Sequence, residues 1–448
     1  MARLHPRDRV LGLSGQKQDG PGETTMAKEQ GEFARGWGVI LAAAAGCGLG
    51  LSALPFYGLG PLMTPLGEEF GWSRTEISIA FTFMTLGLLI AGPVIVGRLS
   101  DRIGVRAVAL TSIPLFALSL LALQFLRPGP EGAPGPALLW LGYLAMAFFG
   151  AGTSPITYTR AVNAWFDRNR GLALGLTLAG TGAMGIVLPM ILGRVAPEFG
   201  WRGGFVTLAI LAALAWPIVA LLLKNAPPAG LQSQSGPAPG ASLGEAVKNY
   251  RFWALGLAFL ILALGIAGLV VHLFPMLTDA GLTPQEAGGV AALIGVGVIV
   301  GRIVIGFLVD RFFGPLVAIV VFLITAVGCV MLADGGIAIA PYAAFLIGFA
   351  LGAEVDLIAY FTSRYFGIKR YGEIYGWQYG FYGVGAAFAP VLMGALFAAG
   401  GGTYTLALHV SAGLCVIACL LLSLLGRYPR FELDPGAREP SDKRPTTS

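Results

Sequence analysis

Long apolar runs alternate with short polar segments along most of the chain. Each run approaches or exceeds the roughly 20 residues that cross a bilayer as an α-helix. The pattern predicts about twelve such spans, about six on either side of one long polar stretch. The expected spans are Val39–Met63, Ile77–Val96, Val105–Leu126, Ala137–Ile156, Gly171–Val195, Phe205–Leu223, Phe252–Leu277, Val290–Leu308, Leu316–Leu332, Tyr342–Phe361, Ile374–Ala399 and Tyr404–Leu425. We therefore predict an all-α membrane protein with about twelve transmembrane helices in two halves.

Polar segments set the expected domain boundaries. Asn225–Tyr250 is rich in Pro, Gly and Ser and has no periodic apolar pattern, which is typical of a flexible linker. Met1–Gly36 is polar, contains no apolar core of signal-peptide length, and is interpreted as a disordered tail. The expected division is a tail at 1–36, a first half at 37–224, the linker at 225–250, a second half at 251–427 and a tail at 428–448.

Composition supports a membrane protein and excludes several functions. Hydrophobic residues make up 56% of the chain and charged residues 12%, with a mean hydropathy of +0.75. Globular proteins carry about 25% charged residues, so most of this surface must face something other than water. The net charge of +5 is dispersed, which does not indicate nucleic-acid binding. The cysteines Cys47, Cys329, Cys415 and Cys419 lie inside apolar spans without metal-site spacing, so we expect packing residues and no cofactor.

The basic residues predict an orientation. With a cytoplasmic amino terminus, all but five of the 29 Lys and Arg residues fall on the cytoplasmic side. The exceptions are Arg74, Arg127, Arg194 and Arg202 in outside loops and Arg302 inside a span. This asymmetry obeys the positive-inside rule. We therefore expect a multi-pass protein of the cell membrane with both termini in the cytoplasm.

The two halves resemble each other in sequence. Gly97–Arg106 reads GRLSDRIGVR and Gly306–Pro315 reads GFLVDRFFGP, each after the second span of its half. Gly150–Tyr158 (GAGTSPITY) similarly matches Gly352–Tyr360 (GAEVDLIAY). Repeated halves with the same orientation predict pseudosymmetry and a substrate site at their interface near mid-membrane.

The repeated loop resembles the cytoplasmic signature of the major facilitator superfamily. Its glycines allow a tight turn, and its aspartate can cap a helix and pair with an arginine. The resemblance implies a gating loop that holds the inward face closed, with a degenerate copy in the second half. The residues concerned are Gly97, Asp101, Arg102, Gly104 and Arg106, with Asp310 and Arg311 in the copy.

A finer resemblance is to the monocarboxylate and oxalate–formate antiporter branch. Phe70–Ser78 (FGWSRTEIS), Ala164–Leu176 (AWFDRNRGLALGL) and Phe199–Phe205 (FGWRGGF) are similar to loops of that branch. The monocarboxylate carriers have an arginine at the place of Arg302, four residues before a glycine, here Gly306. The resemblance therefore implies that Arg302 binds a substrate carboxylate.

Arg302 suits that role on its own chemistry. Arginine stays charged at any accessible pH, and its planar fork matches a carboxylate. The alternatives are a side chain that reaches for the cytoplasmic face, or a structural ion pair. Two departures from the branch narrow the substrate, because Val298 replaces an aspartate and the neutral Gln378 replaces a lysine. A dicarboxylate would keep one unpaired charge, so a monocarboxylate fits better.

Two acids stand halfway along the tenth expected span. Glu354 and Asp356 correspond to Gly152 and Ser154 in the first half, which cannot titrate as acids do. A carboxyl at mid-membrane is costly and suits proton coupling, or it supplies a counter-charge for Arg302. Two residues apart, they lie about 200° apart on a helix, so both cannot face the cavity. We expect Glu354 to hold Arg302 until it is protonated, and Asp356 to form a structural pair, although two structural acids are an open alternative.

The remaining site candidates are less specific. His272 lies in the seventh expected span, where it could bind the substrate, titrate near neutral pH or join two helices. Tyr158, Tyr360 and Gln378 complete the predicted substrate site. The aromatic residues of the spans suit a larger or aromatic acid, or simply pack.

We predict a secondary transporter that takes up a monocarboxylate with a proton by alternating access, as a monomer in the bilayer. Exchange of carboxylates on the same scaffold is the nearest alternative. Efflux of amphipathic drugs would call for an acid in the first six spans, where none lies at mid-membrane. A non-transporting sensor is disfavoured by the short tails. No P-loop and no nucleophile–base cluster is present in the sequence, so neither an ATP-driven pump nor an enzyme is expected.

Overall fold

The computed structural model describes residues 21–127, 136–166, 170–224, 240–367 and 369–429, without the side chains of 21–32, 93, 94, 97, 101 and 170. The side chain of Asp101 and the site of Gly97 therefore lie outside the description, as do most of both expected tails. Within the described ranges the chain is helical, with one isolated bridge between Gly240 and Gly367.

The first half contains the helices α1 to α8. Their bounds are α1 Pro21–Gly48, α2 Leu54–Phe70, α3 Arg74–Ala91, η1 Gly92–Leu99, α4 Ser100–Ile103, α5 Val105–Ala122, η2 Leu123–Phe125, α6 Ala137–Gly150, η3 Ala151–Thr153, α7 Pro155–Trp165 and α8 Arg170–Leu222. The second half follows with α9 Leu243–Lys248, α10 Tyr250–Asp279, α11 Pro284–Arg311, α12 Gly314–Gly335, η4 Ile337–Ile339, α13 Ala340–Phe366, α14 Tyr371–Ala399 and α15 Thr405–Ser423.

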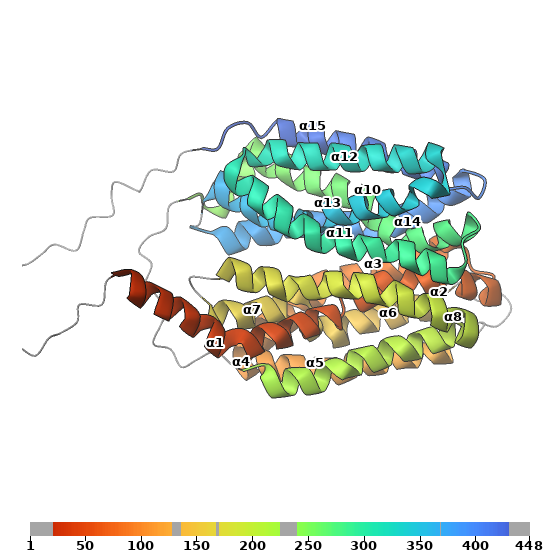
Figure 1. Ribbon diagram of the computed structural model, residues 1–448, viewed down its shortest axis with the longest axis horizontal. Coiled ribbons are helices and arrows are strands. Elements are labelled where there is room, and N and C mark those ends of the chain that lie inside the picture. Colours follow the sequence, from red (N-terminus) through yellow and green to blue (C-terminus); the bar gives the residue numbers. More distant parts are fainter. Residues whose placement is uncertain (1–20, 128–135, 167–169, 225–239, 368, 430–448) are drawn as a thin grey trace, which may run out of the picture.

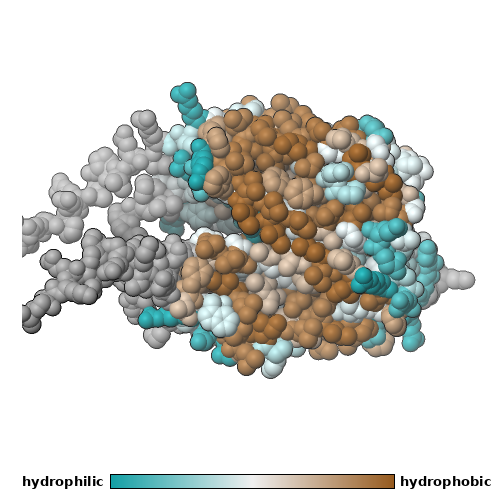
Figure 2. Space-filling model, in the orientation of Figure 1, coloured by the Kyte–Doolittle hydropathy of each residue, from teal (hydrophilic) through white to brown (hydrophobic). Residues whose placement is uncertain are grey.

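These helices account for the expected spans. In the described chain, 10 helices are long and apolar enough to cross a membrane. One of them, α8, contains two expected spans, because the backbone breaks at Gly200 with φ +65°. The first expected span is divided between α1 and α2. Figure 2 shows hydrophobic residues over the middle of the surface and hydrophilic residues toward the two ends, as a bilayer requires.

Two helices of the first half are interrupted at mid-span. The first span breaks between Gly48 and Leu54, and the fourth breaks where Ser154 is extended before Pro155 starts α7. The breaks face each other, because the Leu51 N–H donates to Thr153 Oγ1 at 3.0 Å. Broken helices persist in membranes only where such contacts satisfy the freed backbone groups.

The halves lie side by side, with α1–α8 below and α10–α15 above (Figure 1). They meet through the helix pairs α8–α11, α3–α14 and α2–α10. Glycines allow the backbones to approach closely, since a Cβ on Gly193 would lie 2.5 Å from the Pro284 carbonyl oxygen and one on Gly288 2.6 Å from that of Pro189. We call the end with the turns 71–73, 280–283 and 400–404 the closed end, and the end where 224 and 240 lie the linker end.

The structure differs from two expectations about the polar segments. The last part of the expected linker forms α9, because Ser242 and Glu245 make a reciprocal capping box. The Ala241 N–H donates to the Phe366 carbonyl at 2.8 Å, which attaches this part to the end of α13. Helix α1 begins at Pro21, inside the expected disordered tail.

Candidate substrate site

Arg302 lies about two thirds of the way along α11, nearer the linker end, on the face that packs against α13. Its Nε donates to the Gly352 carbonyl at 3.2 Å and lies 3.3 Å from Asp356 Oδ2. Its Nη1 is buried and has no hydrogen-bond partner among the described residues. One edge of the guanidinium is therefore held by the second half, while a buried donor remains available.

Glycines of α11 and α13 bring Arg302 to this position. A Cβ on Gly301 would lie 2.1 Å from the Phe349 carbonyl oxygen, and one on Gly352 would lie 2.2 Å from that of Val298. The two helices therefore pack backbone against backbone, as small residues four apart allow. Because the approach is so close, the short reach from Arg302 to the Gly352 carbonyl is fixed by the helix packing.

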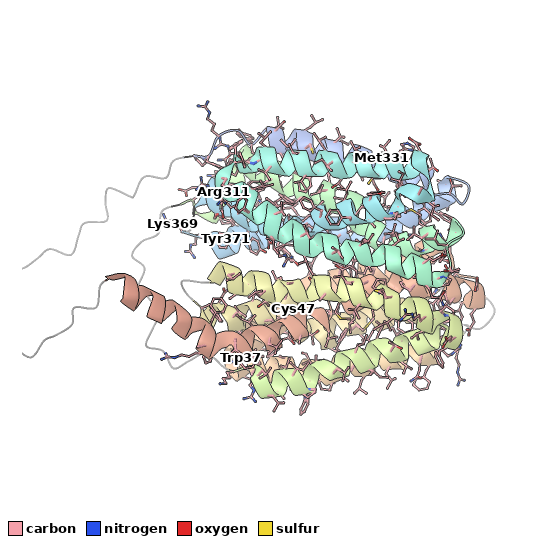
Figure 3. The ribbon with its side chains drawn as sticks, in the orientation of Figure 1. Trp37, Cys47, Arg311, Met331, Lys369 and Tyr371 are labelled. Carbon is pink, nitrogen blue, oxygen red and sulfur yellow. The ribbon has the colours of Figure 1, made fainter. Side chains whose placement is uncertain are left out.

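Arg302 also faces the first half. Its charge acts on Cys47 of α1 and Tyr57 of α2, which are both buried. Cys47 lies midway along the molecule, where α1 passes α8 (Figure 3). The guanidinium is thus near the first half, close to the break of the first span.

The two acids of α13 point in different directions. Asp356 pairs with Arg302, and its side chain is 42% exposed. Glu354 is fully buried, and neither of its oxygens has a hydrogen-bond partner of normal geometry among the described residues. The Tyr382 hydroxyl of α14 is a polar group in its surroundings. The carboxylate beside Arg302 is therefore Asp356 and not Glu354, which we had expected to hold it.

Three other sequence candidates do not converge on Arg302. Tyr158 is buried in the first half, where its ring packs on Gly46 and its hydroxyl has no described partner. Gln378 donates from Nε2 to the Phe252 carbonyl at 3.0 Å, inside the second half. Tyr360 donates to the Val309 carbonyl at 2.9 Å, toward the linker end. Of these, only Tyr158 approaches the Arg302 region, through Cys47.

His272 lies in another place, toward the closed end. Its Nδ1 is 2.9 Å from the Tyr404 hydroxyl, and its Nε2 is 3.0 Å from both Ser78 Oγ and the Pro390 carbonyl oxygen. All of its ring nitrogens are therefore occupied by protein groups. It joins α3 of the first half to three elements of the second.

Sequence reasoning missed the ion pair beside His272. Arg74 binds Asp279 through both guanidinium nitrogens, at 2.5 and 2.7 Å, and donates to the Tyr404 hydroxyl at 2.7 Å. The pair spans 205 residues and joins the two halves. Its only sequence signal was an arginine that departs from the positive-inside pattern.

The described loop residues contact their own halves. Gly104 has φ +85°, a conformation that favours glycine, at the turn into α5. Arg106 donates to the Ala220 carbonyl at 2.7 Å, and Arg311 stacks on the Phe307 ring at 3.4 Å. Asp310 is exposed and forms no ion pair with a described residue. Arg102 is also exposed. In this conformation the described gating residues do not bridge the halves.

Within the described residues no three His, Cys, Asp or Glu side chains gather as metal ligands. The chemistry of the region is therefore that of one cation, two carboxyls in unlike surroundings, and the hydroxyls of neighbouring tyrosines. Such a set can bind an anion and exchange a proton.

Comparisons with known proteins bear on the family and the fold. A family model described as Major Facilitator Superfamily matches residues 45–378. Monocarboxylate transporter 11 of Homo sapiens is 32% identical over 292 residues, which are 63% of this chain and 58% of that protein. The MFS-type transporter pytF of Aspergillus terreus is 29% identical over 254 residues, 55% of this chain and 80% of the relative.

Solved structures share the fold. A bacterial homologue of the human lysosomal transporter Spinster, inward-facing and occupied, superposes with a TM-score of 0.67 at 16% identity, over 87% of this chain and 96% of the other. A D-xylose–proton symporter gives 0.64 at 14% identity, over 86% and 97%. At these identities the match concerns the fold alone.

Proposed function

Because the chain belongs to the Major Facilitator Superfamily, whose members are secondary transporters, we propose that it takes up a monocarboxylate together with a proton. Two relatives named monocarboxylate transporter 11, at 32% and 30% identity, support the substrate class. The positive-inside distribution supports a cytoplasmic linker end in the cell membrane. The unit proposed is a monomer, since each chain contains both halves of the site.

One observation carries the proposal, the buried Nη1 of Arg302 that lacks a partner in the described chain. A buried donor without an acceptor costs about 1–3 kcal/mol, more when it is charged, so an incoming anion gains this energy. Among the described residues, Asp356 is the one carboxylate paired with Arg302, and it contacts the Nε edge at 3.3 Å. A single substrate carboxylate at the free edge completes the coordination of the guanidinium.

The two acids divide the remaining work. Asp356 balances the charge of Arg302 when the site is empty, and its side chain stays partly exposed. Glu354 is buried without a partner among the described residues, where a charge is far more costly than a neutral acid. We therefore assign the transported proton to Glu354. Protonation is coupled to substrate through α13, because this helix carries Glu354 and also contacts Arg302 of α11 through the Gly352 carbonyl and Asp356.

Alternating access follows from where the halves touch. The contacts of α8 with α11 and of α3 with α14 run from mid-span to the closed end. Thr82 of α3, for example, donates to the Ala387 carbonyl at 2.6 Å. Opening the closed end must break these contacts, while the described gating residues come together at the linker end. With the linker end in the cytoplasm, we propose that this conformation is the one open toward the cytoplasm.

Exchange of one carboxylate for another is the second candidate. Arg302 would serve it equally, and Glu354 would then have no role in transport. Proteoliposomes loaded with buffer distinguish the two, because a symporter accumulates a radiolabelled monocarboxylate when only a pH gradient is imposed. Uptake that needs internal carboxylate and ignores the gradient would refute the proton-coupled proposal. Arg427→Lys, at an exposed position of the linker end, is the control for general effects of an arginine change.

A further inference from the structure

A buried polar network closes the interface far from Arg302. We call it the closed-end network, made of Arg74 and Ser78 from α3, His272 and Asp279 from α10, and Tyr404 at the start of α15, with the Pro390 carbonyl of α14. Ser78 and His272 are fully buried, whereas the side chain of Asp279 is 37% exposed. The network therefore crosses the halves and reaches solvent at one edge.

The partners of His272 determine its tautomer. The Pro390 carbonyl can only accept, so Nε2 must carry a hydrogen. Arg74 can only donate, so the Tyr404 oxygen accepts from it, and the Tyr404 hydroxyl hydrogen is free to donate to Nδ1. The closed end thus contains a neutral imidazole that donates from Nε2 and accepts at Nδ1.

A second proton on His272 is incompatible with this arrangement. Nδ1 would become a donor toward Tyr404, whose oxygen already accepts from Arg74. The Tyr404 hydroxyl hydrogen would lose its acceptor, and two cations would share one oxygen. The charged groups that face His272 are Arg74 from α3 and, behind it, Asp279 from α10, while α14 presents only a carbonyl. Asp279 is already neutralised by Arg74, so it cannot balance a second cation.

We infer that His272 is a proton-binding site of its own, and that its protonation opens the closed end. This inference rests on the alternating access of the proposed function and adds a second proton site to it. Opening removes Ser78 and Arg74 together, because both belong to α3. His272 then meets water from outside, where an imidazolium is well solvated. External acid therefore favours the state that receives substrate.

The test measures opening directly and uses no substrate. Spin labels on Glu198→Cys of the first half and Gln285→Cys of the second report the closed end, where both positions are exposed. The four native cysteines are buried, so labelling is directed to the new ones. In wild-type background we expect the distance to lengthen as the pH falls from about 8 to 5. The ratio of open to closed changes by at most about tenfold per pH unit, the limit for one proton.

Two variants test whether His272 is the group that takes up the proton. His272→Gln supplies a donor and an acceptor but takes up no proton, so its distance stays short across the pH range. Tyr404→Phe removes the hydrogen bond to Nδ1, so we expect the opening to shift to higher pH. This variant keeps the inference testable if His272→Gln does not fold. His409→Gln is the control, because His409 pairs with Asp334 at 3.4 Å within the second half and its loss should leave the pH response unchanged.

The outcomes separate this inference from the proposed function. A pH response that survives in His272→Gln, or an unresponsive wild type, overturns the inference. If the closed end of the wild-type protein does not respond to pH but proton-driven uptake persists, the proposed function stands and the inference about His272 fails. A pH-dependent closed end in a protein that accumulates no carboxylate would refute the proposed function alone.

Discussion

The closed-end network and the Arg302 site are both built on an arginine paired with an aspartate, yet they differ in completeness. Arg74 uses two nitrogens on Asp279, a third bond on Tyr404 and an aromatic face on Phe397 at 4.4 Å. Arg302 has one edge occupied and a buried nitrogen without a described partner. Arg74, whose hydrogen bonds are made within the protein, stabilises one conformation. Arg302, which keeps a buried donor without a described partner, is prepared for a ligand.

The comparison predicts its largest effect at Arg302. Arg302→Ala should reduce carboxylate uptake by at least about 100-fold, because a charge-assisted bidentate pair contributes several hydrogen bonds of about 1.5–3 kcal/mol each. Arg302→Lys should recover little, since the fork geometry is lost. The folded yield should remain near wild type. A substrate affinity within about twofold of wild type in the alanine variant would sink the assignment.

Substitution of Glu354 should nearly abolish accumulation driven by a pH gradient and leave the other transport activity intact. Glu354→Gln mimics the neutral acid, so accumulation driven by a pH gradient should disappear while counterflow continues. Asp356→Asn should weaken binding instead, because the Arg302 edge held at 3.3 Å loses its counter-charge. Uptake and counterflow in the same proteoliposomes distinguish the two. Wild-type accumulation by Glu354→Gln would exclude it as the proton carrier.

Breaking the ion pair between Arg74 and Asp279 should change the conformation of the protein more than its affinity for substrate. Asp279→Asn removes the charge opposite Arg74, so the closed end should open about tenfold more often, with an effect moderated by solvent because the pair is partly exposed. The distance between labels at 198 and 285 measures the opening. Exchanging the charges with Arg74→Asp and Asp279→Arg together should restore part of the closed state. If the double variant opens as far as the single ones, the pair does not hold the halves together.

The smallest effect concerns the packing that positions Arg302. Gly301→Ala places a Cβ 2.1 Å from the Phe349 carbonyl oxygen, so α11 and α13 must separate. Overpacking of this kind costs about 1–3 kcal/mol, which should lower the melting temperature by a few degrees. Gly306→Ala on the same helix meets nothing within 4 Å and is the matched control. Equal melting temperatures for the two variants would show that the close approach is not required.

The sequence predicted much of the fold because hydrophobic length and repetition are local signals. The spans and the two halves followed from runs of residues and from the internal repeat. The sequence did not predict contacts in which a residue's partner lies in the other half. Arg74 and Asp279, 205 residues apart, have no pattern that links them.

The same limit explains the candidate residues that lie elsewhere. His272 was grouped with Arg302 as an ionisable residue in an apolar span, Tyr360 as an aromatic residue, and Gln378 because it takes the place of a lysine in similar carriers. Their hydrogen bonds to Tyr404, to the Val309 carbonyl and to the Phe252 carbonyl depend on how helices are rotated in the bundle. The expectation that Glu354 holds Arg302 failed for that reason too, since Asp356 is the carboxylate beside Arg302 and spacing showed only that the two acids diverge. Helix rotation is decided by packing, which a single sequence does not encode locally.

The central claim is that the free edge of Arg302 takes the carboxylate of a monocarboxylate substrate. Equilibrium binding of a panel of monocarboxylates, their neutral amides and the matching dicarboxylates to purified wild type and Arg302→Lys tests it most directly. We predict that a monocarboxylate binds wild type at least about tenfold more tightly than its amide or its dicarboxylate, and that Arg302→Lys loses most of this preference. Amides that bind as tightly as the acids, or a preference that survives in Arg302→Lys, would contradict the account.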